Sequence, residues 1–253
     1  MFRAVPGPLP TPDTRDVGGV TLPQGRLVTN DRGVAVAWIG TETLKEERLA
    51  GLIRGLAAAF SRTGLWPLLV PRSTRATGLD VPWGATGPEQ PKPEIPEALA
   101  VYERICRNHV IHNADYEPPA PPVTTLAAPR PGPQLTPDEL TIRKDGGLLL
   151  VLVARPADVP AALGWIGATN AQATGADISA VLRSWEDRFG ATLVSLGFDT
   201  VEVQLGNRPE SVEQRNVLAA EHFWICPDSF EGFTLDDYSR ALSTTTRWSF
   251  WWD

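Results

Sequence analysis

Lysine, cysteine, histidine and methionine are scarce in this chain of 253 residues, and the first two shortages exclude whole classes of protein. Only three lysines accompany 20 arginines, the net charge is −7, and no cluster of basic residues is present. A nucleic-acid-binding protein needs clustered positive charge to displace counterions from phosphates. Two cysteines, Cys106 and Cys226, are too few to hold a protein of this size together by disulfides. We therefore expect no nucleic-acid partner and no oxidising compartment.

Long apolar runs and recognisable catalytic motifs are missing as well. No stretch approaches the roughly 18 apolar residues that a membrane span needs, and the first residues lack the apolar core of a signal peptide. Glycine-rich phosphate loops, a GxSxG nucleophile elbow and an HExxH zinc motif do not occur. The sequence therefore predicts a cytoplasmic protein with no membrane partner and no cofactor.

Tryptophan, in contrast, is abundant: the chain has nine, and four aromatic residues crowd five positions near its end. Terminal segments left in water are usually small and polar, so these rings must be buried or offered to a partner. Along a strand, side chains alternate, which puts Trp248, Phe250 and Trp252 on one face and Ser249 and Trp251 on the other. Trp251 is therefore the ring most expected to be exposed, and exposed tryptophans are favoured anchors of binding sites.

The N-terminal half divides into three segments by composition. Residues 1–24 are rich in proline, glycine and polar residues, and we expect them to be extended or disordered. Residues 25–70 predict a βαβ unit, because two apolar strands flank a helix whose apolar residues recur at i, i+3, i+4, i+7 and i+11. Residues 71–147 are rich in proline and predict a connector with a single helix, from about Pro96 to Asn113.

Local signals set the expected boundaries of the βαβ unit. Thr43 with Glu46 is typical of a capping box at a helix start, and Gly64 is a typical helix stop. Pro67 falls inside the second strand, residues 65–70. Because proline cannot donate a hydrogen bond to a neighbouring strand, we expect this strand at an edge of the sheet.

Residues 148–253 predict the defining domain of the chain. An apolar strand opens it, and Asp177 is expected to cap the next long helix. A strand pair follows around a turn at 197–199, and Ser211 with Gln214 predicts a second capping box. We expect an α+β fold, in which a mixed β-sheet is covered by amphipathic helices.

Several stretches of this C-terminal block resemble one known family. They are Ala162-Leu163-Gly164-Trp165 with Asn170, Leu182-Arg183-Ser184-Trp185-Glu186-Asp187-Arg188-Phe189-Gly190, Ala220-Glu221-His222-Phe223-Trp224-Ile225-Cys226-Pro227-Asp228, and the terminal Trp-Ser-Phe-Trp-Trp-Asp. In combination they resemble the bacterial family called domain of unknown function 4253, over about residues 148–253. Gly64-Leu65-Trp66-Pro67-Leu68 also resembles the front part of its longer members. Because the family has no established activity, the resemblance implies a fold and no function.

His222 and Cys226 stand four residues apart on one predicted helix, a spacing that is compatible with a nucleophilic pair or half of a metal site. The helix dipole opposes a thiolate at the C-terminal end, where Cys226 falls, whereas activated cysteines favour helix N-termini. The same dipole favours a protonated His222 that pairs with Glu221 or Asp228. A structural role is therefore the main prediction, and metal binding and catalysis stay open.

Cys106, His109 and His112 form a second cluster, so every cysteine and histidine of the chain falls into one of two groups. If the two groups met, Cys106, His109, His222 and Cys226 could supply the four ligands of a zinc site. However, Cys-x2-His-x2-His is not a standard zinc spacing, and Cys106 and His109 also continue an apolar helical stripe. Buried core residues are the preferred interpretation, so we assign no metal.

The helix that contains Trp185 has a charged face, which includes Glu186 and Arg188. A solvated face with weak ion pairs is the ordinary interpretation. The alternative is that Glu186 and Arg188 are buried partners in a network between elements, because a charge beside a buried aromatic ring needs a partner.

Three functions are compatible with these features. The preferred hypothesis is a non-enzymatic protein-binding module, comparable to acidic bacterial immunity proteins of α+β type. In this hypothesis Trp251 and neighbouring carboxylates of the chain contact the partner. The alternative is a hydrolytic or metal-assisted enzyme centred on His222, Cys226 and Asp228, which requires a concave site around a perturbed histidine. A purely structural or scaffolding role is the third.

Overall fold

The computed structural model describes residues 1–253 except 12, 75–76, 85–86, 91–93 and 113–116, together with the side chains of all these residues but 110–112. The strands are β1 (Asp16–Val17), β2 (Val20–Thr21), β3 (Gly25–Thr29), β4 (Ala35–Gly40), β5 (Leu65–Pro71), β6 (Gly146–Leu152), β7 (Thr192–Leu196), β8 (Thr200–Gln204) and β9 (Arg247–Trp251). The α-helices are α1 (Glu46–Thr63), α2 (Ala98–His112), α3 (Val159–Ala162), α4 (Gly175–Phe189), α5 (Val212–Ile225) and α6 (Leu235–Ala241). Short 3-10 helices are η1 (Pro137–Glu139), η2 (Pro156–Asp158), η3 (Thr169–Ala171) and η4 (Pro227–Phe230).

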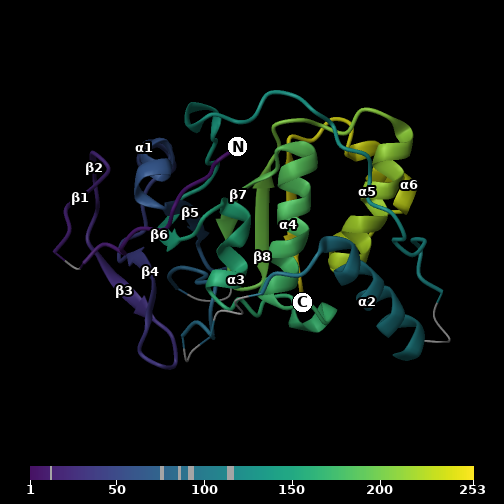
Figure 1. Cartoon of the computed structure of the whole chain (residues 1–253), viewed down its shortest axis with the longest axis horizontal. Helices are drawn as coiled ribbons and strands as arrows, with labels where there is room; N and C mark the ends of the chain where they lie inside the picture. The colour runs from purple at the N-terminus through teal and green to yellow at the C-terminus, as the bar shows by residue number, and fades with distance from the viewer. Residues whose placement is uncertain (12, 75–76, 85–86, 91–93, 113–116) are drawn as a thin grey trace.

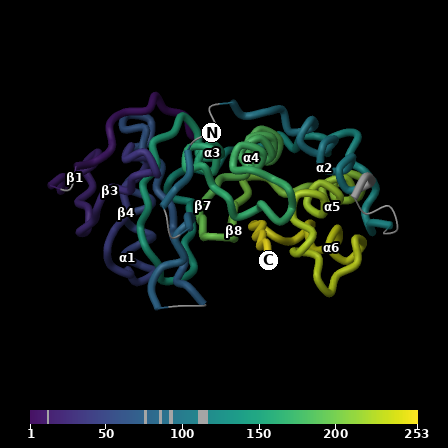
Figure 2. The backbone as a smooth tube through the Cα atoms, turned by 90° about the horizontal axis from the view of Figure 1, so that it is seen from below, coloured from purple at the N-terminus to yellow at the C-terminus, as the bar shows by residue number. Residues whose placement is uncertain are grey.

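Seven of the strands form one mixed sheet in the order β3-β4-β6-β5-β7-β8-β9, so the fold is α+β, as expected (Figure 1). Its neighbouring strands are antiparallel except β5 and β7, which run parallel. Helices α3 and α4 lie on one side of the strands and α1 lies on the other (Figure 2). None of the helices within the described residues has the length and apolar content to cross a membrane.

The predicted βαβ unit forms, but β4 and β5 are not neighbours. Strand β6, from the C-terminal block, lies between them and pairs antiparallel with both. Helix α1 buries its apolar stripe, including Leu49, Ile53, Leu56 and Phe60, and ends at Gly64 with φ 66°, as expected. The N-terminal unit and the C-terminal block therefore share one sheet.

The capping box predicted from Thr43 and Glu46 is wrong. The residue before α1 is Lys45, and its side chain caps nothing. Instead, the carboxylate of Asp145 accepts a hydrogen bond from the Glu46 N–H at 3.0 Å. It also forms an ion pair with Lys45 at 2.8 Å. The cap comes from the residue that immediately precedes β6, a long-range contact that local sequence does not reveal.

The edge position predicted from Pro67 is also wrong, because β5 lies between β6 and β7. Only one residue pair, Leu69 with Ser195, bridges β5 and β7. Two residues earlier in β7, the carbonyl of Leu193 accepts a hydrogen bond from the Trp66 indole N–H at 2.9 Å. The indole therefore supplies a donor on the side of β5 where Pro67 has none.

Most boundary predictions for the C-terminal block are confirmed, with one correction. The Ser211–Gln214 capping box opens α5, and β7 and β8 form the predicted antiparallel pair. The predicted cap of α4 is displaced by one turn: Thr174 is the capping residue, and Asp177 is its capping-box partner. In β9, Trp248 is 2% exposed and Trp251 is 37% exposed, so the predicted alternation is confirmed.

The N-terminal segment, expected to be extended or disordered, runs along the surface of the other elements. Phe2 packs on Trp66 with ring centroids 4.8 Å apart, and the Ala4 N–H donates to the Ala154 carbonyl at 2.9 Å. In the connector, α2 begins at Ala98, close to the predicted start, whereas the predicted end at Asn113 lies outside the described residues.

Candidate functional site

Trp185 lies in a buried aromatic cluster and not on a surface. Its ring stacks on Phe250 with centroids 5.1 Å apart, and it meets Trp248 at 5.4 Å and His222 at 4.7 Å. These contacts join α4, α5 and β9 into one core. Since Trp185 is only 2% exposed, it packs inside the core and is not accessible to a partner.

His222 belongs to the same cluster and has no exposed surface. Its Nδ1 lies 3.0 Å from the Tyr238 hydroxyl, and its Nε2 has no hydrogen-bond partner among the described residues. Burial, aided by the nearby Arg188 guanidinium, lowers the pKa of His222 well below its ordinary value. The protonated, salt-bridged His222 expected from the helix dipole is therefore wrong: the ring is neutral and its partner is Tyr238.

Cys226 caps the C-terminal end of α5 and does not contact His222 through its thiol. Its Sγ lies 3.0 Å from both the Ser229 hydroxyl and the Trp251 carbonyl oxygen. Burial raises the pKa of the Cys226 thiol to about 12, so a thiolate does not form at neutral pH. A nucleophile and its base must share a hydrogen bond, and this pair does not.

The zinc site considered for Cys106, His109, His222 and Cys226 does not assemble. Within the described part of the chain, no three histidine, cysteine or acidic side chains are arranged to hold a metal ion. His109 packs edge-on against Trp224 with centroids 5.3 Å apart, and burial raises the pKa of the Cys106 thiol. Cys106, His222 and Cys226 are buried, whereas His109 is half-buried and lines a surface cavity.

Arg188 and Glu221 form a buried ion pair between α4 and α5. Two guanidinium nitrogens of Arg188 donate to the two carboxylate oxygens, at 2.9 and 2.6 Å. The same carboxylate also accepts from the Trp185 indole at 2.9 Å and from the Ala127 N–H at 2.7 Å. Glu221 has no exposed surface. Arg188 is therefore a buried network partner, the alternative that the sequence left open.

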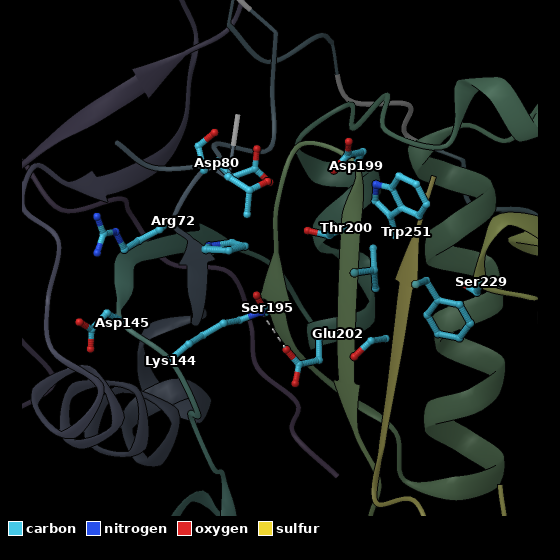
Figure 3. A pocket seen from close by; sticks show the side chains of 16 residues that line it. Arg72, Asp80, Lys144, Asp145, Ser195, Asp199, Thr200, Glu202, Ser229 and Trp251 are labelled. Carbon is cyan, nitrogen blue, oxygen red and sulfur yellow. Dashed lines mark ion pairs between the residues drawn. The ribbon is translucent and has the colours of Figure 1, made fainter. Parts of the chain in front are cut away.

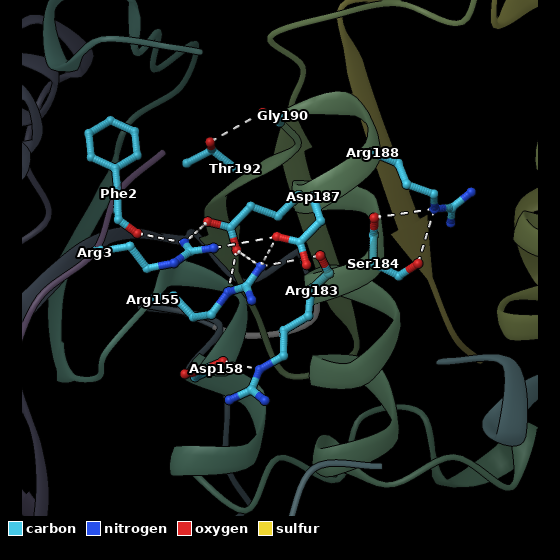
Figure 4. Close-up of polar contacts among 11 residues, drawn as sticks. Phe2, Arg3, Arg155, Asp158, Arg183, Ser184, Asp187, Arg188, Gly190 and Thr192 are labelled. Carbon is cyan, nitrogen blue, oxygen red and sulfur yellow. Dashed lines mark hydrogen bonds and ion pairs between the residues drawn. The ribbon is translucent and has the colours of Figure 1, made fainter. Parts of the chain in front are cut away.

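Glu186 is buried in a second network, whose members Arg3, Arg155 and Asp187 lie on the other side of α4 from Arg188 (Figure 4). It is 2% exposed and accepts from Arg3 and from Arg155, each at 2.7 Å. Burial raises the pKa of Glu186 above its ordinary value, although Arg155 and Arg3 act in the opposite direction. Arg155 and Arg3 also contact Asp187, at 2.7 and 3.4 Å. This network attaches the N-terminal segment to α4 and leaves Glu186 unavailable to a partner.

Asp228 and Trp251, the two remaining candidates, lie together at a surface cavity of about 800 Å³, which we call the acidic groove. Its wall includes the rings of Trp224 and Phe233 and the carboxylates of Asp228, Glu231 and Asp253. Among the described residues that line it, none is lysine or arginine. Phe233 is 59% exposed and Trp251 37% exposed, so both rings are accessible.

A second cavity, of about 620 Å³, opens on the face of the sheet opposite α4, and we call it the sheet cavity (Figure 3). Strand pairing aligns Ser195, Glu202 and Ser249 across β7, β8 and β9, and it aligns Thr200 with Trp251. All five of these residues line the cavity. Trp251 thus lies between the acidic groove and the sheet cavity and contributes to both.

The sheet cavity was not predicted from the sequence. Its lining comes from segments that are distant in sequence, including Arg72 and Asp80 after β5 and Lys144 before β6. One signal was available: in β8 the polar residues Thr200, Glu202 and Gln204 alternate with Val201 and Val203. This alternation indicates that the second face of the strand is polar and has no helix over it.

The geometry thus defines an α+β protein with two surface cavities that meet at one exposed tryptophan. Residues 147–253 match the family model described as Domain of unknown function (DUF4253), which confirms the resemblance of the C-terminal block. No curated protein and no solved structure matches the chain. The match begins within β6 and extends through β9, so it includes Trp251 and the wall of the acidic groove except the part contributed by α2 and the connector.

Proposed function

We propose that this chain is a non-enzymatic protein-binding module whose partner docks in the acidic groove and contacts Trp251. The observation that supports this most directly is the combination of accessible rings and carboxylates with the absence of lysine and arginine among the described residues of the groove wall. Neither Asp228 nor Glu231 forms an ion pair within the described residues, so their charges are available to a partner. Aromatic anchors surrounded by a polar rim are typical of protein interfaces.

The charge of the groove supports a basic partner. Three carboxylates line one wall, and the chain as a whole carries a net charge of −7. A partner segment that combines arginine or lysine with apolar side chains matches both features, because a cation can lie over an aromatic face and beside a carboxylate at once. Acidic immunity proteins that neutralise basic toxins provide a fold-level analogy for such a pair.

The enzyme alternative has less support, because it requires His222, Cys226 and Asp228 to act together. The buried neutral histidine bonds to Tyr238, and the thiol bonds to Ser229 and to backbone. Asp228 instead accepts a hydrogen bond from the Asp253 N–H at 3.1 Å. The three side chains therefore have separate partners, and no nucleophile–base pair remains for the proposed chemistry.

Two labelled peptides of equal length and equal leucine and tryptophan content test the proposal, one carrying arginines and the other glutamates. Fluorescence anisotropy at several salt concentrations measures their affinities. We expect the basic peptide to bind, with an affinity that falls as salt screens the charges. Asp228→Asn with Glu231→Gln should weaken binding roughly tenfold, and Trp251→Ala should weaken it by roughly thirtyfold, as for an interface anchor.

The matched control is Glu47→Gln with Asp236→Asn, which removes two exposed charges outside the groove. This control variant should bind like the wild type. Equal affinity for the two peptides, or unchanged binding by Trp251→Ala, would show that the groove is not the docking surface.

A further inference from the structure

The sheet cavity lies at the carboxyl ends of β5 and β7, the one parallel pair in the seven-stranded sheet as described. Arg72 directly follows β5, and Asp199 follows β7. In sheets with parallel strands, ligands bind in the crevice beyond the carboxyl ends, where the loops diverge. The position therefore favours a ligand site, which shares Trp251 with the acidic groove on which the proposed function depends.

Ser195 on the floor of this cavity is a buried polar group without a protein partner. It is only 3% exposed, and within the described part of the chain its hydroxyl makes no hydrogen bond. The hydroxyl oxygen is nevertheless not among the fully enclosed side-chain atoms that lack a partner, so it is accessible from the cavity. Because Ser195 pairs with Glu202 and lines the cavity, a bound molecule can form a hydrogen bond with this accessible hydroxyl.

The neighbouring charges are divided between occupied and available groups. Glu202 is held on both oxygens, by Arg247 on one and by Lys144 at 3.5 Å on the other. Arg72 forms no salt bridge within the described residues, although its charge helps to lower the pKa of Asp145. Arg72, which has no salt bridge within the described residues, and Ser195 therefore both line this cavity.

The charges also exclude simple classes of ligand. Carboxylates of Asp80, Asp199 and Glu202 line the cavity together with Arg72 and Lys144. A polyanion would meet the carboxylates, and a polycation would meet the two cationic side chains. Carboxylates only accept hydrogen bonds and guanidinium groups only donate them, whereas an alcohol does both. A ligand with several hydroxyl groups can therefore donate hydrogen bonds to the carboxylates and accept them from the cationic side chains.

The size and the rim of the cavity support the same class of ligand. A volume of about 620 Å³ is far larger than an ion needs and falls in the range of pockets for small organic molecules. The half-exposed Trp251 ring closes one side and offers a flat, electron-rich face to the C–H groups of a sugar ring.

We propose that the sheet cavity is a binding site for a polyhydroxylated ring ligand, that is, a sugar or a molecule that carries one. Ser195 donates to or accepts from one ligand hydroxyl, Arg72 donates to another, and Trp251 packs on the ring. No covalent step is involved.

A panel of neutral mono- and disaccharides, with adenosine and uridine as ribose-bearing members, tests this proposal. Glucuronate and glucosamine serve as the charged comparisons. Ligand-detected NMR and the thermal unfolding midpoint report binding to the full chain. We expect at least one neutral member to bind, and a preference for a nucleoside would identify the sugar source as ribose. The proposal is overturned if no neutral member binds at a ligand concentration on the order of 10 mM, which is high enough to detect weak binding. It is also overturned if the protein prefers a charged comparison.

Two variants connect binding to the cavity without touching Trp251. Ser195→Ala should weaken the best ligand at least tenfold and leave the unliganded unfolding midpoint unchanged or higher, because the hydroxyl has no partner to lose. Arg72→Met should also weaken binding tenfold, whereas Arg143→Met and Ser243→Ala, outside the cavity, should not. Unchanged affinity in both cavity variants, or a lower unfolding midpoint of unliganded Ser195→Ala, contradicts the assignment. Failure here leaves the acidic-groove peptide test unaffected.

Discussion

Replacing Arg188 by methionine tests the energetic importance of the buried ion pair with Glu221. Methionine keeps an apolar chain of similar length and removes the positive charge that pairs with the carboxylate. Glu221 has no exposed surface and accepts four hydrogen bonds, two of them from Arg188. The variant leaves an uncompensated charge inside the protein, which costs about 3–5 kcal/mol of unfolding free energy.

Adding Glu221→Gln to this variant should restore part of the loss. The amide oxygen of glutamine can still accept from the Trp185 indole and the Ala127 N–H, and no charge remains buried. We expect the double variant to be more stable than Arg188→Met by roughly 2 kcal/mol, because each charge is harmful mainly in the absence of the other.

Urea unfolding followed by tryptophan fluorescence measures both changes. With a slope of about 2–3 kcal/mol per molar urea, the Arg188→Met midpoint should fall by roughly 1–2 M. A loss below about 1 kcal/mol for Arg188→Met, or a double variant as unstable as the sum of the two single variants, would refute the reasoning. Either result would mean that water or a rearranged side chain reaches Glu221.

Two further predictions concern pH and backbone space. Because His222 stays neutral in the fold while the unfolded chain protonates below its ordinary pKa of about 6.5, its stabilising contribution is present above that pH and is lost on acidification. Between pH 7 and pH 5 the unfolding free energy of the wild type should therefore fall by about 2 kcal/mol more than that of His222→Leu, as measured by urea unfolding. Parallel pH profiles of the two proteins would contradict this. Gly51→Ala should raise the unfolding free energy by about 0.5–1 kcal/mol, since a Cβ there meets nothing within 4 Å in an exposed turn of α1. Gly175→Ala should lower it by about 1–3 kcal/mol, since a Cβ there would lie 2.4 Å from the Pro160 carbonyl oxygen, and equal effects of the two substitutions would argue against this packing.

The sequence predicted the elements whose cause is local. The apolar stripe of α1 and the Ser211–Gln214 capping box depend on residues within one helix, and the alternation of β9 requires only the period of a strand. Trp251 was found from that alternation alone. The family resemblance of the C-terminal block agrees with the family model that matches residues 147–253, and it carries no information on activity.

The errors have long-range causes. The start of α1 is capped by Asp145, which is distant in the chain, and β5 tolerates Pro67 in the sheet interior because the Trp66 indole replaces a missing donor. Likewise, the protonation of His222 depends on rings from α4 and β9 that surround it, and these outweigh the helix dipole. The sheet cavity required the strand order, which sequence periodicity does not contain.

The position of β6 between β4 and β5 determines the order in which the protein can complete its fold during synthesis. Strands β4 and β5 leave the ribosome before the proline-rich connector, and β6 follows only after it, a delay on the order of several seconds at cellular rates. During this interval the two apolar strands lack the neighbour they share, and such open edges favour aggregation. The front part of the chain is therefore a nascent intermediate that depends on prompt arrival of the C-terminal block, and a chaperone would act most usefully in this interval.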